Sequence, residues 1–410
     1  MKKTISMLKQ ESGVALMMAI ASVTLLMIIA TEVMYETGVE LVVSSQAVNQ
    51  LKAHYAAKAG VQLSLLRIHA YKKAASLAGD KIPASMLDPI WQMPFAWPPV
   101  VGENVSAVEK GEIQSAVKES KMQGTYFVTI QSEGGKLDIN DLASPSKVIA
   151  TSTRQQLLQM LTTKMESDDA FADKNRGVEF STIVDNITDW VDDDKTQRGG
   201  RGDESSLYPS RGPNDVMPPN APFKTLEELH MVAGMTDDLY DLLAPRLTVF
   251  GTKGINVNYA SKDVLMSLSP QITDERAGRI IEDRAKPDRG PFKSEEDFVQ
   301  YLGTIGISGN PFQGEKEEEK VPLLFGSEFN FRIISTGRAG RVQREITAVT
   351  YDLGRVKAQL KSQLPKPSPS PTPPGDPSLP PQPTPTPTPA STKAAPVPNE
   401  QPNIVYWNER

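Results

Sequence analysis

The longest apolar stretch lies close to the start of the chain. Residues 14–31 read VALMMAIASVTLLMIIAT and contain no charged side chain. As a helix this stretch would be about 27 Å long, close to the thickness of the hydrocarbon core of a bilayer. Lys2, Lys3 and Lys9 precede it against a single acid, Glu11. This charge bias predicts a single-pass membrane anchor with a cytoplasmic N-terminus and the bulk of the chain outside.

Helical periodicity continues well beyond the apolar stretch. Between residues 47 and 77, apolar side chains recur every three or four positions, and no proline occurs before Pro83. Gly79 and Pro83 are helix-breaking residues. The pattern therefore predicts one membrane and amphipathic helix over residues 14–79.

Two strand-like regions are separated by a long helical block. Residues 126–130 are rich in β-favouring side chains and are followed by a Gly-Gly turn and residues 136–140, which predicts a hairpin. A second hairpin is predicted over residues 330–351. Strands interrupted by helices suggest one antiparallel sheet that carries an insertion. The predicted parts are a sheet over 80–140, an inserted helical domain over 141–325, and the rest of the sheet over 326–360.

The inserted domain is internally duplicated. Leu-Asp-Ile-Asn at 137–140 resembles Ile-Asn-Val-Asn at 255–258, and each is followed by a predicted helix. Pro-Phe-Lys-Thr at 222–225 matches Pro-Phe-Lys-Ser at 291–294, with an acid three residues after the hydroxyl residue, as in a helix capping box. We therefore expect two similar helical units, the second over 255–303.

The end of the chain changes character twice. Residues 361–402 are rich in proline, threonine and serine, and such a composition favours an extended linker without a core. Residues 403–410 contain Ile-Val-Tyr-Trp, which predicts a terminal strand, with a solvated tail as the alternative.

Composition excludes several classes of function. The 410 residues include no cysteine and only three histidines, which excludes thiol catalysis and histidine-rich metal centres. The net charge of −6 argues against bulk binding of nucleic acid, and no phosphate-binding glycine loop is present. We therefore do not expect an enzyme.

An acidic loop is the candidate metal site. Asp189 and Asp192–Asp194 precede a glycine-rich stretch that ends with Asp203 and Glu204. Carboxylates on a flexible loop suit Ca²⁺, which prefers six to eight oxygen ligands. The spacing is not that of an EF-hand, because Gln197 stands where the turn glycine is needed. A solvated acidic loop without metal is the alternative.

The start of the chain resembles the class III signal of type IV pilins and type II secretion pseudopilins. Gly13 directly precedes the apolar stretch, and the resemblance implies cleavage between Gly13 and Val14 on the cytoplasmic side. The family usually has Glu at the fifth mature position, where this chain has Met18. K-type minor pseudopilins share that departure. A cleaved secretory signal and a plain signal anchor are the alternatives.

Two further segments resemble K-type minor pseudopilins. Residues 53–60 match their Ala-x-Tyr-Ala-Ala-x-Ala-Gly stretch, and an alanine-rich core face is the alternative. This match indicates packing of small residues against a helix or a sheet, and we assign partner-helix packing to Tyr55, Ala56, Ala59 and Gly60. The acidic loop resembles the calcium-binding block of the same family, which implies Asp192, Asp194 and Glu204 as ligands, with Asp189 and Asp203 as further candidates. Ser205 replaces an Asp of the family pattern.

The resemblance implies an α+β fold, in which a long transmembrane helix packs on a small antiparallel sheet with two inserted units like SAM or helix-hairpin-helix domains. It also implies a minor pseudopilin that is cleaved and methylated, is anchored in the inner membrane, binds Ca²⁺ and caps the pseudopilus tip, where it helps to initiate assembly. The implied partners are the I- and J-type minor pseudopilins, the major pseudopilin, prepilin peptidase and the assembly platform, with no nucleic acid. A minor type IV pilin-tip subunit and a membrane-anchored DNA-uptake protein are the alternatives.

Overall fold

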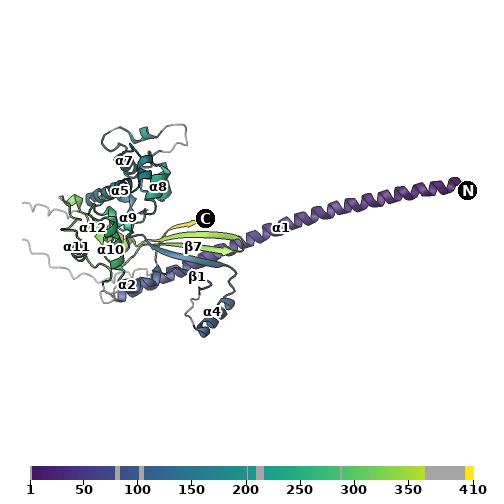
Figure 1. Cartoon of the computed structure of the whole chain (residues 1–410), viewed down its shortest axis with the longest axis horizontal. Helices are drawn as coiled ribbons and strands as arrows, with labels where there is room; N and C mark the ends of the chain where they lie inside the picture. Colours follow the sequence, from purple (N-terminus) through teal and green to yellow (C-terminus); the bar gives the residue numbers. More distant parts are fainter. Residues whose placement is uncertain are drawn as a thin grey trace, which may run out of the picture.

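The computed structural model describes residues 2–78, 84–100, 106–200, 202–208, 217–286, 289–314, 316–364 and 402–410. A single helix, α1 (Lys2–Ala78), leads into the body of the protein, and its N-terminal half projects away from that body (Figure 1). Within the projecting part, an 18-residue window has a mean hydropathy of 2.5 and none of it is buried. By length and composition, α1 is therefore able to cross a membrane.

The C-terminal half of α1 packs on an antiparallel sheet. The strands of this sheet, in spatial order, are β1 (Phe95–Trp97), β2 (Thr125–Ser132), β7 (Phe331–Ala339), β8 (Val342–Thr350) and β9 (Ile404–Glu409). Alternate residues of β7 are buried, as expected for a strand with one face on a core. The predicted fold class, an α+β protein with a long N-terminal helix on a small antiparallel sheet, is confirmed.

Small residues set the distance between α1 and the sheet. Ala53 and Ala57 are fully buried, and the Ser335 hydroxyl on β7 donates a hydrogen bond of 2.7 Å to the Ala57 carbonyl. A Cβ added to Gly60 would clash with the side chains of Ser335 and Val128. The alanine-glycine signature therefore serves the close approach of α1 to the chain's own sheet.

This packing corrects part of the predicted partner-helix set. Ala56 is 2% exposed and Gly60 is buried, so both face the sheet of the same chain rather than a partner. Ala59 is partly buried against the same core. Tyr55 is 58% exposed, so it is the member of the set that is free to contact another protein.

The predicted hairpin at residues 126–140 is wrong. β2 pairs instead with β7, which lies some two hundred residues later in the chain. The chain turns away at Glu133–Gly135, and β3 (Leu137–Asp138) pairs in parallel with β4 (Leu247–Thr248). The first part of the sheet therefore ends at Ser132, and the inserted domain begins earlier than position 141.

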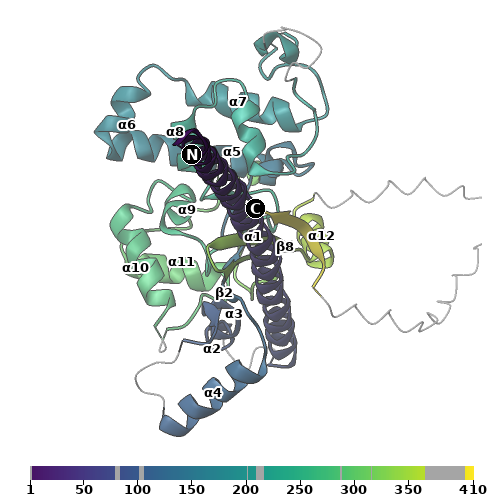
Figure 2. The ribbon, with the colours of Figure 1, turned by 90° about the vertical axis from the view of Figure 1, so that its right-hand side faces the viewer.

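The insertion consists of two units that lie one above the other beside the sheet (Figure 2). The first unit, from β3 to β4, contains η2 (Ile139–Ala143), α5 (Lys147–Ser167), α6 (Asp169–Lys174), α7 (Phe180–Val191), η3 (Glu204–Leu207), η4 (Leu226–Met231) and α8 (Asp237–Leu243). The second unit, from β5 (Ile255–Asn256) to β6 (Leu323–Leu324), contains α9 (Lys262–Ser267), α10 (Asp274–Arg284), α11 (Glu295–Thr304) and η5 (Glu317–Glu319). The strands β5 and β6 are also parallel. One hydrophobic core runs through both units and is distinct from the core under α1.

Three short helices follow α1, namely α2 (Ala84–Leu87), α3 (Pro89–Gln92) and α4 (Ala107–Glu119). The helix α12 (Leu353–Ser362) follows β8, so the second part of the sheet ends at Thr350 rather than at residue 360. The predicted proline-rich linker lies outside the described residues except at its ends. Beyond it, β9 pairs with β8 and forms one edge of the sheet.

Buried polar groups join the insertion to the sheet and to α1. The Glu133 carboxylate, which is 0% exposed, accepts hydrogen bonds from Arg332 on β7 and from the Thr248 hydroxyl of the first unit. On the other side, the Asp88 carboxylate accepts hydrogen bonds from Tyr71 of α1 and Tyr259 of the second unit, at 3.1 and 2.9 Å. Because buried polar groups are costly to separate from their partners, these bonds fix the orientation of the insertion.

Candidate metal centre

The acidic loop is anchored by the C-terminal end of α7. Trp190, 3% exposed, stacks on Phe223 with ring centroids 6.1 Å apart and an interplanar angle of 12°. The helix ends where Asp192 adopts an extended conformation. Gly199 and Gly200 both have positive φ angles, of 84° and 69°, and so supply a tight turn that other residues rarely adopt. The acidic residues therefore lie on both arms of a loop with a fixed base.

The two arms return to each other beyond this turn. Thr196 and Asp203 form an isolated antiparallel bridge, and the Gln197 side-chain amide donates to the Asp203 carbonyl at 2.8 Å. Glu204 begins η3 directly after this bridge. The pairing therefore brings Glu204 back to the end of α7. Asp192 and Asp194 thus lie close to Glu204 although they precede it by ten residues or more in the sequence.

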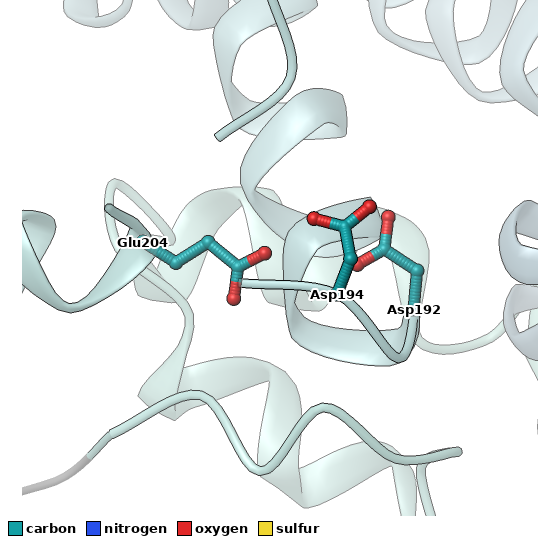
Figure 3. A group of neighbouring side chains, drawn as sticks. All are labelled: Asp192, Asp194 and Glu204. Atoms are coloured by element: carbon teal, nitrogen blue, oxygen red, sulfur yellow. The ribbon is translucent and has the colours of Figure 1, made fainter. Parts of the chain in front are cut away.

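Three predicted ligands meet at this point. One carboxylate oxygen from each of Asp192, Asp194 and Glu204 lies within 4.8 Å of the other two. Figure 3 shows Asp192 and Asp194 on one arm and Glu204 on the other, with their carboxylates directed toward a common space. Three like charges at this separation repel one another unless protons or a cation neutralise them.

Two oxygens of the cluster lack a partner. Glu204 is 2% exposed, and its Oε1 atom has no hydrogen-bond donor among the described residues. The Oδ1 atom of Asp192 is likewise buried without a described donor. Burial, with added repulsion from Asp194 and Asp189, raises the pKa of Asp192 to about 6. Burial also raises the pKa of Glu204.

The other two predicted ligands have other roles. Asp189, 3% exposed, accepts the Arg198 backbone N–H at 3.1 and 3.3 Å from its two oxygens, and so fixes the start of the loop. Asp203 caps η3 by accepting the Ser205 backbone N–H at 2.9 Å. Neither belongs to the cluster of three carboxylates that the described residues form.

Sequence reasoning missed one residue that positions the site. The Asn220 side-chain amide donates a hydrogen bond of 3.0 Å to Oε2 of Glu204, which leaves Oε1 directed into the cluster. Asn220 has a φ of 47°, a left-handed conformation that asparagine tolerates better than most residues. An isolated asparagine sixteen residues from its partner gives no signal in sequence.

The donor set fits a hard divalent cation. Carboxylate oxygens suit Ca²⁺ and Mg²⁺, whereas soft or borderline metals favour Cys and His ligands, which the three residues do not include. A cation would satisfy the unpartnered oxygens and remove the repulsion between the three charges.

The predicted processing site lies on the projecting half of α1. Gly13 has no atom within 4 Å of the position that a Cβ would take, and Val14 is 53% exposed. Met18 is 66% exposed on the same half of the helix.

The fold and the site together define a protein of pilin-like organisation, with a long apolar N-terminal helix able to cross a membrane and a sheet that carries a duplicated helical insertion with an acidic loop. Two family models match this insertion, and both are described as type II secretion system (T2SS), protein K: the first covers residues 135–252 and the second residues 255–316. The inserted domain, residues 135–316, therefore matches type II secretion protein K, a family of minor pseudopilins and not a known enzyme family. The predicted recognition is therefore confirmed.

Among solved structures, the chain is similar to one chain of the GspK-GspI-GspJ complex from the type 2 secretion system of enterotoxigenic Escherichia coli. The sequences are 18% identical, the TM-score is 0.42, and the match covers 57% of this chain and 77% of that chain. No curated protein matches the chain.

Proposed function

We propose that this minor pseudopilin caps the tip of the pseudopilus and helps to initiate its assembly for protein export across the outer membrane. The observation that carries the proposal is the position of the insertion. Its helices lie at the end of the body opposite to the projecting N-terminal end of α1 (Figure 1). In a filament built from parallel α1 helices, the inserted domain would occupy the space needed by the next subunit toward the tip. This protein therefore fits the tip position, where no such subunit is present.

The residue at position 18 supports the same proposal. A carboxylate in hydrocarbon is costly unless it is paired, and in a pilin-like filament its partner would be the amino terminus of a neighbouring subunit. The apolar Met18 needs no such partner. Met18 is therefore compatible with a subunit at the tip, which has no further subunit beyond it to supply an amino terminus.

We also propose the membrane topology and the partners. The lysine-rich segment before residue 14 favours a cytoplasmic N-terminus and a periplasmic body in the inner membrane. Cleavage by prepilin peptidase between Gly13 and Val14 would leave the apolar helix on the mature chain. The I- and J-type minor pseudopilins, the major pseudopilin and the assembly platform are the proposed partners, and the solved complex of a similar K chain with I and J chains motivates the first two.

Calcium is the proposed structural cation of the acidic loop. The unpartnered oxygens of Asp192 and Glu204 support a bound cation, and the flexible glycine-rich loop suits the larger Ca²⁺ better than Mg²⁺, which demands near-ideal octahedral geometry. When bound, the ion would join the two arms of the loop. Asp192, Asp194 and Glu204 would hold it, and Asn220 would orient Glu204.

Labelling of isolated filaments tests the tip position. An epitope inserted at Gly309, in an exposed turn of the second unit, is expected to place one gold particle at one end of each sheared pseudopilus. The same epitope on the major pseudopilin is the control and should label the whole length. Particles distributed along the filament for the tagged K-family subunit would contradict the capping role. Mass spectrometry of the same preparation should find Val14 as the first residue.

A further inference from the structure

A cleft of about 240 Å³ lies between the first unit and the outer edge of the sheet, apart from the acidic loop. It is lined by Lys136, Lys224, Tyr240, Phe250, Arg332 and Tyr406, together with short segments next to them. Tyr406 belongs to β9, so the terminal strand supplies one wall of the cleft. Each of the six side chains is at least partly exposed, so the cleft is open to solvent.

The charges at the base of the cleft are not balanced. Lys136 and Arg332 both pair with one carboxylate, Glu133, and the Lys136 Nζ atom lies 3.4 Å from Glu133 Oε1. Arg332 makes this ion pair through its Nε atom, and its two Nη atoms have no acceptor in the part of the chain that the structure describes. Burial lowers the pKa of Lys136, and Glu133 offsets this effect only in part. A second carboxylate would therefore be stabilised beside these two cations.

The rim adds another positive charge. Lys224 makes no ion pair among the described residues, and only its backbone N–H is engaged, by Glu228 at 2.9 Å. The acid on the rim, Glu227, is paired with Arg410 at 3.0 Å. An anion that enters the cleft therefore meets an excess of positive charge at the base and the Lys224 ammonium at the rim, where backbone N–H groups already engage the Glu228 carboxylate.

The walls are aromatic. The rings of Phe250 and Tyr406 lie 5.6 Å apart at 48°, and the ring of Tyr240 packs on that of His230 with centroids 3.8 Å apart. Aromatic walls contact apolar and planar groups well, and the tyrosine hydroxyls add hydrogen-bond donors. The cleft thus combines apolar walls with a cationic base. This arrangement suits a ligand that carries both an apolar group and a negative charge.

We propose that this cleft binds a peptide segment through a carboxylate that reaches Lys136, Arg332 and Lys224, with an adjacent apolar side chain between Phe250 and Tyr406. A volume of about 240 Å³ is smaller than a typical site for a drug-sized ligand, so it accommodates one or two residues rather than a folded surface. The carboxylate is either an acidic side chain or the C-terminus of the bound peptide. This binding does not depend on the tip position of the subunit.

Fluorescence anisotropy with the full chain in detergent micelles tests the proposal. The first probe is a labelled peptide with blocked termini and the sequence Gly-Phe-Glu-Phe-Gly; the second is labelled Gly-Gly-Gln-Phe with a free C-terminal carboxylate. A peptide with Gln in place of Glu and blocked termini is the neutral control. At least one acidic probe should bind about tenfold more tightly than the control, as expected for a hydrogen bond to a charged group. The probe that binds identifies the source of the carboxylate.

The internal duplication supplies a matched variant. Lys224→Glu should weaken binding of the acidic probe about tenfold or more, whereas Lys293→Glu, at the equivalent position of the second unit, should leave it unchanged. Tyr406→Ala should also weaken binding. Melting curves of each variant establish that the fold is retained. Equal binding of acidic and neutral peptides, equal effects of the two lysine variants, or no binding of either acidic probe at millimolar concentration would overturn the proposal.

Discussion

The first and second units of the insertion are each closed by an asparagine that holds the backbone of a Pro-Phe-Lys segment. In the first unit, Asn140 accepts the Phe223 N–H at 2.7 Å and donates to the Phe223 carbonyl at 3.1 Å. In the second, Asn258 makes the same two bonds with Phe292, at 2.8 and 2.9 Å. The two units therefore share a frame down to individual hydrogen bonds.

The units differ in the length of chain that this frame encloses. The clamped residues are 83 positions apart in the first unit and 34 in the second. Acids of the second unit have partners within the chain: Arg289 pairs with Asp297 at 3.0 Å, and the Tyr301 hydroxyl donates to Asp283 at 2.7 Å. The longer first unit leaves carboxylate oxygens unpartnered. The same frame thus supports one unit whose acids are paired within the chain and one that leaves buried carboxylate oxygens without a described donor.

Truncation of the clamped aromatic should have the largest effect. Phe292 is 1% exposed and contacts the rings of Phe298 and Tyr301, so Phe292→Ala should cost about 3–5 kcal/mol of unfolding free energy, with or without calcium. Thermal melting monitored by circular dichroism measures the loss. Phe127→Ala, at a half-exposed position on β2, is the control and should cost much less. Similar losses for both variants would show that the second unit is not tightly packed.

The second-largest expected effect is the loss of stabilisation by calcium, which should depend on acids of the first unit and not on acids of the second. A ligand at a hundredfold excess over its Kd stabilises the native state by about 2.7 kcal/mol, so the wild type should melt at a higher temperature with Ca²⁺ than with chelator. Asp192→Asn combined with Asp194→Asn should abolish this shift. In the second unit, Asp274→Asn combined with Glu275→Gln removes two charges in the first turn of α10 and should retain it. A Ca²⁺ shift that survives in the first double variant would exclude these ligands.

The pH dependence of stability, measured in the presence of chelator, should show a smaller effect of the acidic cluster in the first unit. The pKa of Asp192 in the native state, about 6, is higher than in the unfolded chain, so the native state is favoured by protonation. This contribution is unfavourable at neutral pH, and it diminishes as the pH falls below about 6 toward the lower pKa of the unfolded chain. Asp192→Asn should therefore reduce the gain in stability between pH 7 and pH 5. An unchanged pH profile in this variant would contradict the raised pKa.

Helix capping in the second unit should give the smallest effect. The Ser294 hydroxyl accepts the Asp297 N–H at 3.2 Å at the start of α11. Ser294→Ala should cost about 1 kcal/mol of unfolding free energy. Ser115→Ala, at an exposed position within α4, is the control and should cost nothing. A loss of several kcal/mol at Ser294 would mean that this unit depends on its cap rather than on its aromatic core.

Local signals in the sequence predicted the helix, the duplication and the acidic loop, because each depends on residues that are close together in the chain. Thr225 and Ser294 do stand at the N-terminal caps of η4 and α11. The pairing partner of β2 was missed because a turn of two glycines indicates a hairpin, whereas the buried face of β2 is completed by β7 far along the chain. Asn220 and the cleft were missed for the same reason, since distant segments create them.

The terminal strand has a consequence for the order of folding during synthesis. Thr350 of β8 pairs with Ile404, 54 positions later, by the difference of their residue numbers. A hairpin such as β7–β8 forms within microseconds, whereas synthesis of 54 residues takes about 3–11 s at ordinary rates. Throughout this interval the outer edge of β8 has no strand beside it. Charged residues on that strand, such as Arg344 and Glu345, then discourage pairing with other nascent chains.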